Sequence, residues 1–184
     1  SFMPTKGNLT SFSQSLPMYA EDSYIRNSFS TSHYKEFSED IIGALKISAS
    51  AINGLKGDDV RVSKRSFLSS RKLRGFKAGK VGPKDGEDYI GGNYTTALNL
   101  EANFPNFFPE KSNAELGLFF DAGNVWGVDY SDTLDDSNEI RSSLGFNLSW
   151  ISPAGPMSFV ISNNVSKAST DQDESFNFRL GTTF

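Results

Sequence analysis

The sequence predicts an all-β protein, an antiparallel up-and-down meander of about eight strands. Apolar and polar residues alternate with a period of two over runs of about 10 to 12 residues, as in ESFNFRLGTTF (174–184) and IRSSLGFNLSWI (140–151). Aromatic residues such as Phe104, Trp126 and Trp150 close the apolar faces near the strand ends. Short connections alternate with long ones along the chain, as a meander requires.

Each strand is assigned from its own alternation. Residues 113–124, for example, set Leu116, Leu118 and Phe120 against Glu115 and Asp121. The first three strands alternate less cleanly than the others. We expect the strands at 7–17, 23–36, 40–53, 90–104, 113–127, 139–152, 156–167 and 174–184.

Strand length separates two all-β interpretations. Strands of soluble β-sandwiches are usually about 5 to 6 residues long. A tilted strand that crosses a bilayer needs about 9 to 11 residues. The polar faces carry Asn, Ser, Thr, Gly and Arg, which suits a hydrated lumen. The pattern therefore favours a transmembrane β-barrel, or part of one, over a soluble sandwich or lipid-binding barrel.

The connections fall into two classes. NFPNFFPEKSN (103–113) and SPAGP (152–156) are short and contain proline, as periplasmic turns do. The segments 54–89, 127–139 and 166–174 are longer and charged, as external loops are. The two classes alternate along the chain, which places them at opposite ends of the barrel.

Composition excludes several functions. The 184 residues include no Cys and a single histidine, His33, so no disulfide framework or thiolate metal site is expected. A net charge of −4 with dispersed basic residues argues against a nucleic-acid partner. Asp171 and Asp173 have the spacing of the first ligands of a calcium loop, but the required Gly and Glu do not follow. We expect no enzyme, no cofactor and no metal.

A series of motifs in a fixed order resembles the C-terminal half of the BamA family, the outer-membrane β-barrel assembly proteins. The resemblance covers essentially the whole chain and implies about half of a sixteen-stranded transmembrane β-barrel, whose periplasmic POTRA domains lie outside these residues. The motifs are FMPTKGNLTSFSQSLP (2–17), LRGF (73–76), GPKDG (82–86), IGGN (90–93), FFDAGNVW (119–126), WISPAGPMSF (150–159) and FNFRLGTTF (176–184).

The resemblance implies that residues 54–89 form a loop that folds back into the lumen, with Arg74, Gly75 and Phe76 docked on the inner wall. Alternation independently places Glu101 and Asp121 on the polar face of adjacent strands. A guanidinium in the lumen needs a bidentate acceptor, because an unpaired buried charge is costly. In the family these two carboxylates hold the loop arginine. The alternative is that all three are solvated charges.

The resemblance also gives the last strand a function. Phe176, Phe178, Gly181 and Phe184 correspond to the C-terminal signal by which outer-membrane proteins are delivered for assembly. In the family this strand pairs weakly with the first strand, and the seam between them opens to receive a substrate strand. An unpaired edge would also favour edge-to-edge self-association of this chain.

The implied function is assembly and insertion of nascent β-barrel proteins in the bacterial outer membrane. The implied partners are those nascent barrels, the lipid bilayer and, through the periplasmic domains, the lipoproteins of the assembly complex. The alternative within the superfamily is a pore that secretes polypeptides, by two-partner secretion or as a TamA-type paralogue. A passive eight-stranded porin is disfavoured, because so narrow a lumen could not hold the long loop.

Overall fold

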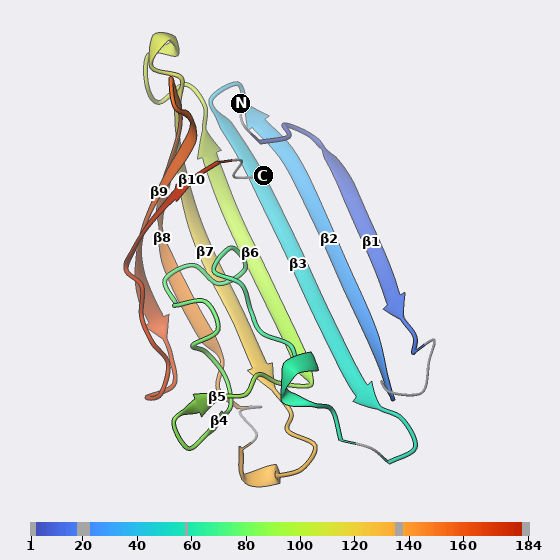
Figure 1. Cartoon of the computed structure of the whole chain (residues 1–184). Helices are drawn as coiled ribbons and strands as arrows, with labels where there is room; N and C mark the ends of the chain where they lie inside the picture. The colour runs from blue at the N-terminus through green and yellow to red at the C-terminus, as the bar shows by residue number, and fades with distance from the viewer. Residues whose placement is uncertain (1–2, 18–22, 58, 135–137, 182–184) are drawn as a thin grey trace.

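A computed structural model describes residues 3–17, 23–57, 59–134 and 138–181. Eight strands form one antiparallel sheet in the order β1-β2-β3-β6-β7-β8-β9-β10, so the strands of this sheet pair in the order in which they follow one another in the sequence (Figure 1). The predicted meander is therefore confirmed. The strands are β1 (Gly7–Ser15), β2 (Tyr24–Ser38), β3 (Ile41–Gly54), β6 (Tyr94–Phe104), β7 (Ala114–Trp126), β8 (Arg141–Ser152), β9 (Gly155–Ser166) and β10 (Phe176–Leu180).

Two strands differ from the predicted ranges by more than a residue or two at one end. The strand expected from residue 90 begins at Tyr94, because Gly92 still pairs with Ser66 of the preceding loop. The last strand was expected to span 174–184, but β10 ends at Leu180. Gly181 has φ +115°, which turns the backbone out of the extended conformation, and residues 182–184 lie outside the described part.

The two faces of the sheet differ as alternation predicts. Leu144 and Phe146 point outward and are 50% and 43% exposed, whereas Ser143, which precedes Leu144, is fully buried. Phe176 and Phe178 are also exposed on the outward face, and Leu148 is half-buried there. The alternation in residues 140–151 and 174–184 predicts this outward side for Leu144, Phe146, Leu148, Phe176 and Phe178.

The packed core lies between the loop and the inner wall of the sheet. Residues 59–93 fold back against the concave side of the strands, with a small hairpin of β4 (Lys84–Asp85) and β5 (Asp88–Tyr89) near one end (Figure 1). Loop and wall together form one buried apolar cluster, which explains how a loop rich in Gly, Lys and Arg stays ordered. Its members are Leu68, Leu73, Phe76, Val81, Ala97 and Val125.

Among the described residues, helical structure is limited to three short 3-10 turns in the connections, at Val62–Lys64, Glu110–Ser112 and Asp132–Leu134. Across the described ranges, the chain forms no helix whose length and hydropathy would suit a membrane crossing.

Adjacent residues on β8 offer a test of the two faces. We expect Phe146→Arg to lower the free energy of unfolding by about 2 to 4 kcal/mol, the usual penalty for a cation on the lipid face near the bilayer midplane. Asn147→Arg is the control, because Asn147 faces the lumen. Urea titration in lipid vesicles, followed by gel migration of folded and unfolded forms, measures both. Equal losses would contradict the assignment of the faces.

Candidate functional site: the infolded loop on the inner wall

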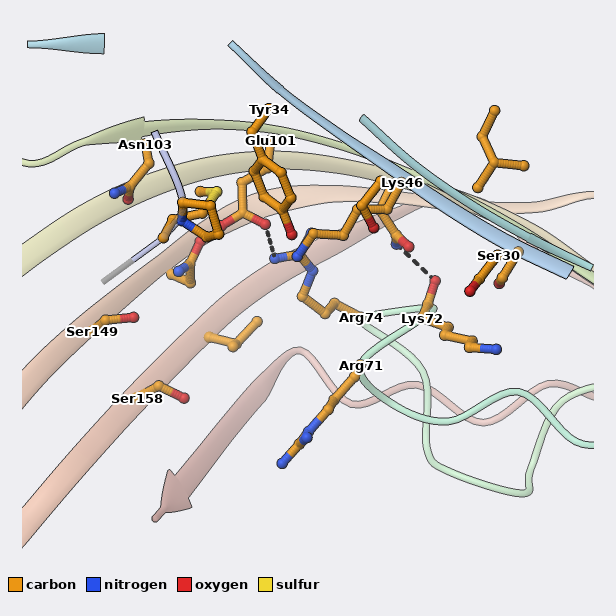
Figure 2. Close-up of a pocket in the computed structure, with 18 of the residues that line it drawn as sticks. Ser30, Tyr34, Lys46, Arg71, Lys72, Arg74, Glu101, Asn103, Ser149 and Ser158 are labelled. Atoms are coloured by element: carbon orange, nitrogen blue, oxygen red, sulfur yellow. Dashed lines mark hydrogen bonds and ion pairs between the residues drawn. The ribbon is translucent and has the colours of Figure 1, made fainter. Parts of the chain in front are cut away.

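Arg74, at the tip of the loop, is paired with both predicted carboxylates. Its Nε and Nη2 donate to Oδ2 and Oδ1 of Asp121 at 2.7 and 2.8 Å, and its Nη1 donates to Oε2 of Glu101 at 3.1 Å. Figure 2 shows the side chain reaching from the loop toward Glu101. The backbone amide of Arg74 also donates to Asp121 at 3.0 Å. The Asp121 side chain is fully buried. Its two charge-assisted hydrogen bonds to Arg74 are therefore stronger than hydrogen bonds between neutral groups.

Three further wall residues support the pair, and sequence reasoning assigned none of them a role. Asn99 donates to Asp121 at 2.8 Å and to the carbonyl of Lys72 at 2.9 Å. The Ser143 hydroxyl donates to the carbonyl of Arg74. The guanidinium carbon of Arg74 lies 3.7 Å from the centre of the Phe119 ring, within the range of a cation–π contact. A lone aromatic on an otherwise polar face, next to the predicted acid, was the signal in the sequence.

Gly75 allows the loop to approach the wall. Its φ of +90° is a conformation that residues with a Cβ rarely adopt. A Cβ at this position would lie 2.6 Å from Oδ1 of Asn164 and 3.1 Å from Cβ of Ser143. Phe76 follows and is buried in the apolar cluster. The structure thus places all three predicted loop-tip residues against the inner wall.

The loop tip also pairs with the connection between β9 and β10, which the sequence did not suggest. Phe76 and Asp173 form an isolated antiparallel bridge. The amide of Lys77 donates to the carbonyl of Gln172 at 2.9 Å, and that of Glu174 donates to the carbonyl of Gly75 at 2.9 Å. The tip is therefore held by main-chain hydrogen bonds as well as by the ion pair.

A second buried ion pair joins β8 to the same connection. Arg141 donates from Nε and Nη2 to the two carboxylate oxygens of Asp171 at 2.8 and 3.0 Å, and both side chains are fully buried. Asp171 also accepts from the amide of Ala168 at 2.7 Å, and Arg141 donates to Asn124 at 2.7 Å. Asp171 is therefore an ion-pair partner in this structure.

A third pair lies among the external connections, where Arg65 of the loop contacts Asp129. Asp129 also accepts from the amide of Val60 at 2.7 Å and from Asn93 at 3.2 Å. Burial opposes ionisation of Asp129, but these hydrogen bonds and the Arg65 charge outweigh it and lower the pKa of the carboxyl. The carboxylate therefore stays charged at neutral pH and ties the two connections together.

A cavity of about 410 Å³ lies between the loop and the wall. The side chains of Lys46, Arg71, Lys72 and Arg74 line it together with Glu101 (Figure 2). Positive charge therefore predominates around the loop tip on the lumen side.

The last strand lies at the edge of the sheet. Phe178 pairs with Phe159 of β9, and within the described chain β10 has no second partner strand. The guanidinium of Arg179 donates from Nη2 to the carbonyl and hydroxyl of Ser70 at 2.9 and 3.0 Å, so the strand contacts the infolded loop. Gly181 donates its amide to the carbonyl of Pro156 at 2.8 Å. Phe184, the predicted end of the assembly signal, lies outside the described residues.

The described ranges contain no group of three or more His, Cys, Asp and Glu side chains arranged to hold a metal ion.

Comparisons with known proteins agree with this architecture. The sequence profile of the Omp85 superfamily domain matches residues 1–184. Outer membrane protein assembly factor BamA of Neisseria meningitidis serogroup B is 33% identical over 141 residues, 61% of this chain and 17% of the relative. The BamA of Neorickettsia risticii is 28% identical over 165 residues, 88% of this chain and 22% of the relative. The chain thus spans about a fifth of these relatives' length.

A solved structure has the same fold. The crystal structure of BamA from Haemophilus ducreyi lacking POTRA domains 1-3 superimposes with a TM-score of 0.84 and 28% sequence identity. The match covers 97% of this chain and 38% of that one.

Removing either partner of the Arg74–Asp121 pair should loosen the loop. We expect Arg74→Ala and Asp121→Ala each to cost about 3 to 5 kcal/mol, because the first leaves the buried Asp121 without a cation and the second leaves Arg74 with Glu101 as its one carboxylate among the described residues. The double variant should cost less than the sum of the two, and Arg74→Lys should restore the contact only in part. The measurement is the rate of thermolysin cleavage between residues 60 and 85.

The control for this cycle is Lys77→Ala, because that side chain is exposed and Lys77 is tied to Gln172 and Lys80 through its backbone. It should leave the cleavage rate unchanged. Strict additivity of the two single variants would show that Arg74 and Asp121 do not interact.

Gly75 and Gly79 provide a matched pair of glycines in the same loop. Both have positive φ, +90° and +69°, but a Cβ would meet nothing within 4 Å at Gly79. We expect Gly79→Ala to cost about 1 to 2 kcal/mol from backbone conformation alone. Gly75→Ala should cost more, because Asn164 is held by Asp173 at 2.7 Å and cannot readily move away. The same cleavage assay compares them, and equal rates would contradict close docking.

Proposed function

Because the chain belongs to the Omp85 superfamily of outer-membrane β-barrel proteins, we propose that it is the C-terminal part of the barrel of a BamA-type factor, which folds and inserts other β-barrel proteins. The observation that carries the proposal is the edge strand β10, which ends a sheet whose inner strands are paired on both sides. The two relatives named BamA favour this function over the secretion pore that the sequence left open.

An edge strand can act without covalent chemistry. Its unpaired N–H and C=O groups template an incoming strand, which is the recognition mode called β-augmentation. β10 has five residues whereas β8 and β9 have 12 each, so the edge that would receive a substrate strand is short and is held to β9 by few hydrogen bonds. We therefore assign no enzymatic activity and no cofactor to this part of the protein.

The docked loop would support that edge. Its tip is fixed to β7 through Asp121, to the β9–β10 connection through Asp173, and to β10 itself through Arg179. A rigid wall behind a short edge strand would keep the edge in position while a substrate strand pairs with it. Nascent β-barrel proteins and the bilayer are the proposed partners here, and the assembly-complex lipoproteins would bind through periplasmic domains.

The proposal is tested by cysteine crosslinking in the protein with its full natural chain. Phe178→Cys on β10 should form disulfides with a cysteine in the C-terminal strand of a substrate barrel during assembly. Ile161→Cys on β9 is the matched control, because Ile161 is 45% exposed and Phe178 47%, but β9 has a partner on each side. Substrates that assemble normally while β10 gives no more crosslinks than β9 would contradict the proposal.

A further inference from the structure

A hollow of about 490 Å³ lies on the outward face of the sheet, across β2, β3, β6 and β7. Gly43 and Ala102, paired in register, form its floor. Leu118 and Phe120 form one wall and Phe37 another. The Phe37 ring lies over Gly43, where a Cβ would be 2.5 Å from its Cε2, so the hollow depends on the absence of a side chain there.

Lys35 lies at the margin of this hollow and is unusual in its position. The strand register places it on the same outward face as Gly43 and Ala102. Of the strand residues that the structure describes, it is the one charged side chain at an outward register position. A charge on a lipid-facing surface is costly and marks a functional position unless it finds a partner.

The contacts of Lys35 leave its charge without a counterion in the described chain. Its Nζ lies 5.3 Å from the centre of the Phe37 ring, a cation–π contact, and no carboxylate of the described residues is in ion-pair range. His33 lies two residues away on the same face and is hydrogen-bonded to Asn8. The margin of the hollow is thus polar and cationic, while its floor and far wall are apolar.

The position of Lys35 along the strand indicates which leaflet it meets. It lies three residues before Ser38, where β2 ends at the tight turn to β3. That distance is about 10 Å along a strand. The turn is at the same end of the barrel as the other short connections, which we assign to the periplasmic side. A lysine at this depth can extend its ammonium group to the level of the lipid phosphates.

We propose that this hollow binds an anionic phospholipid of the periplasmic leaflet. The lipid phosphate would pair with the Lys35 ammonium beside His33, and one acyl chain would lie over Gly43 and Ala102 against Leu118 and Phe120. Charge complementarity favours this occupant, because Lys35, the one charged outward position among the described strand residues, adjoins a hollow that is otherwise apolar. The inference rests on the outer-membrane location of the barrel and is independent of its proposed role in assembly.

A fluorescence experiment on the protein with its full natural chain tests the proposal. Phe37→Trp places a reporter at the wall of the hollow and keeps an aromatic ring beside Lys35. The protein is reconstituted in phosphatidylcholine nanodiscs with increasing fractions of acyl-brominated phosphatidylglycerol or acyl-brominated phosphatidylcholine. The protein without this substitution gives the background from all its natural tryptophans, which include Trp126 and Trp150. Half-maximal quenching should need about fivefold less of the anionic lipid, the preference expected of one lysine near an anionic headgroup.

Three variants in the reporter background decide the outcome. Lys35→Gln should abolish the preference for the anionic lipid, and Lys35→Arg should keep it. Lys46→Gln is the matched control, because Lys46 lies on the neighbouring strand but lines the lumen. Heat-dependent gel migration verifies that each variant is folded. Equal quenching by both lipids in the reporter protein, or an unchanged preference in folded Lys35→Gln, would overturn the proposal, and neither result depends on assembly of substrates.

Discussion

Burial of positive charge against the inner wall is the constraint on which the rest of this structure depends. The loop supplies Arg74, and the wall must supply an acceptor because a buried guanidinium cannot lose its proton. The two carboxylate oxygens of Asp121 accept from Nε and Nη2 of Arg74, and Glu101 accepts from Nη1. Breaking such a pair costs more than forming it contributes, so it fixes where the loop lies rather than simply adding stability.

Two more arginines are paired with carboxylates near the external connections. Arg141 pairs with Asp171 and Arg65 with Asp129, each beside backbone amides that occupy the remaining acceptor sites. The three pairs span the infolded loop, β7, β8 and two external connections. A segment with few apolar residues is thereby ordered by specific charge pairs around one small apolar cluster. This arrangement makes the loop a structural part of the wall.

The sequence was sufficient for the strand order and the two faces, because period-two alternation fixes the side on which each strand residue lies, including Glu101 and Asp121. The docking of Arg74 against these carboxylates was implied by the resemblance to the BamA family and not by the alternation. The sequence could not show contacts that depend on how connections fold. The pairing of Asp171 with Arg141 and the bridge between Phe76 and Asp173 join segments whose separation in sequence carries no periodic signal. The early end of β10 likewise depends on the backbone conformation of Gly181 and not on the alternation, which continues past it.

Charged side chains are common on the lumen face of the sheet and rare on its outward face. Lys35 is therefore notable because it lies on the outward face. On the lumen side, cations are numerous, and the deeply buried ones are matched by carboxylates of the same chain. On the outward side, the described strands carry charge at Lys35 and nowhere else, and the chain offers it an aromatic ring in place of a counterion. Because charged residues are otherwise excluded from the described outward positions, we infer that Lys35 pairs with a group outside the protein. In a bilayer, the abundant anion at that depth is a lipid phosphate.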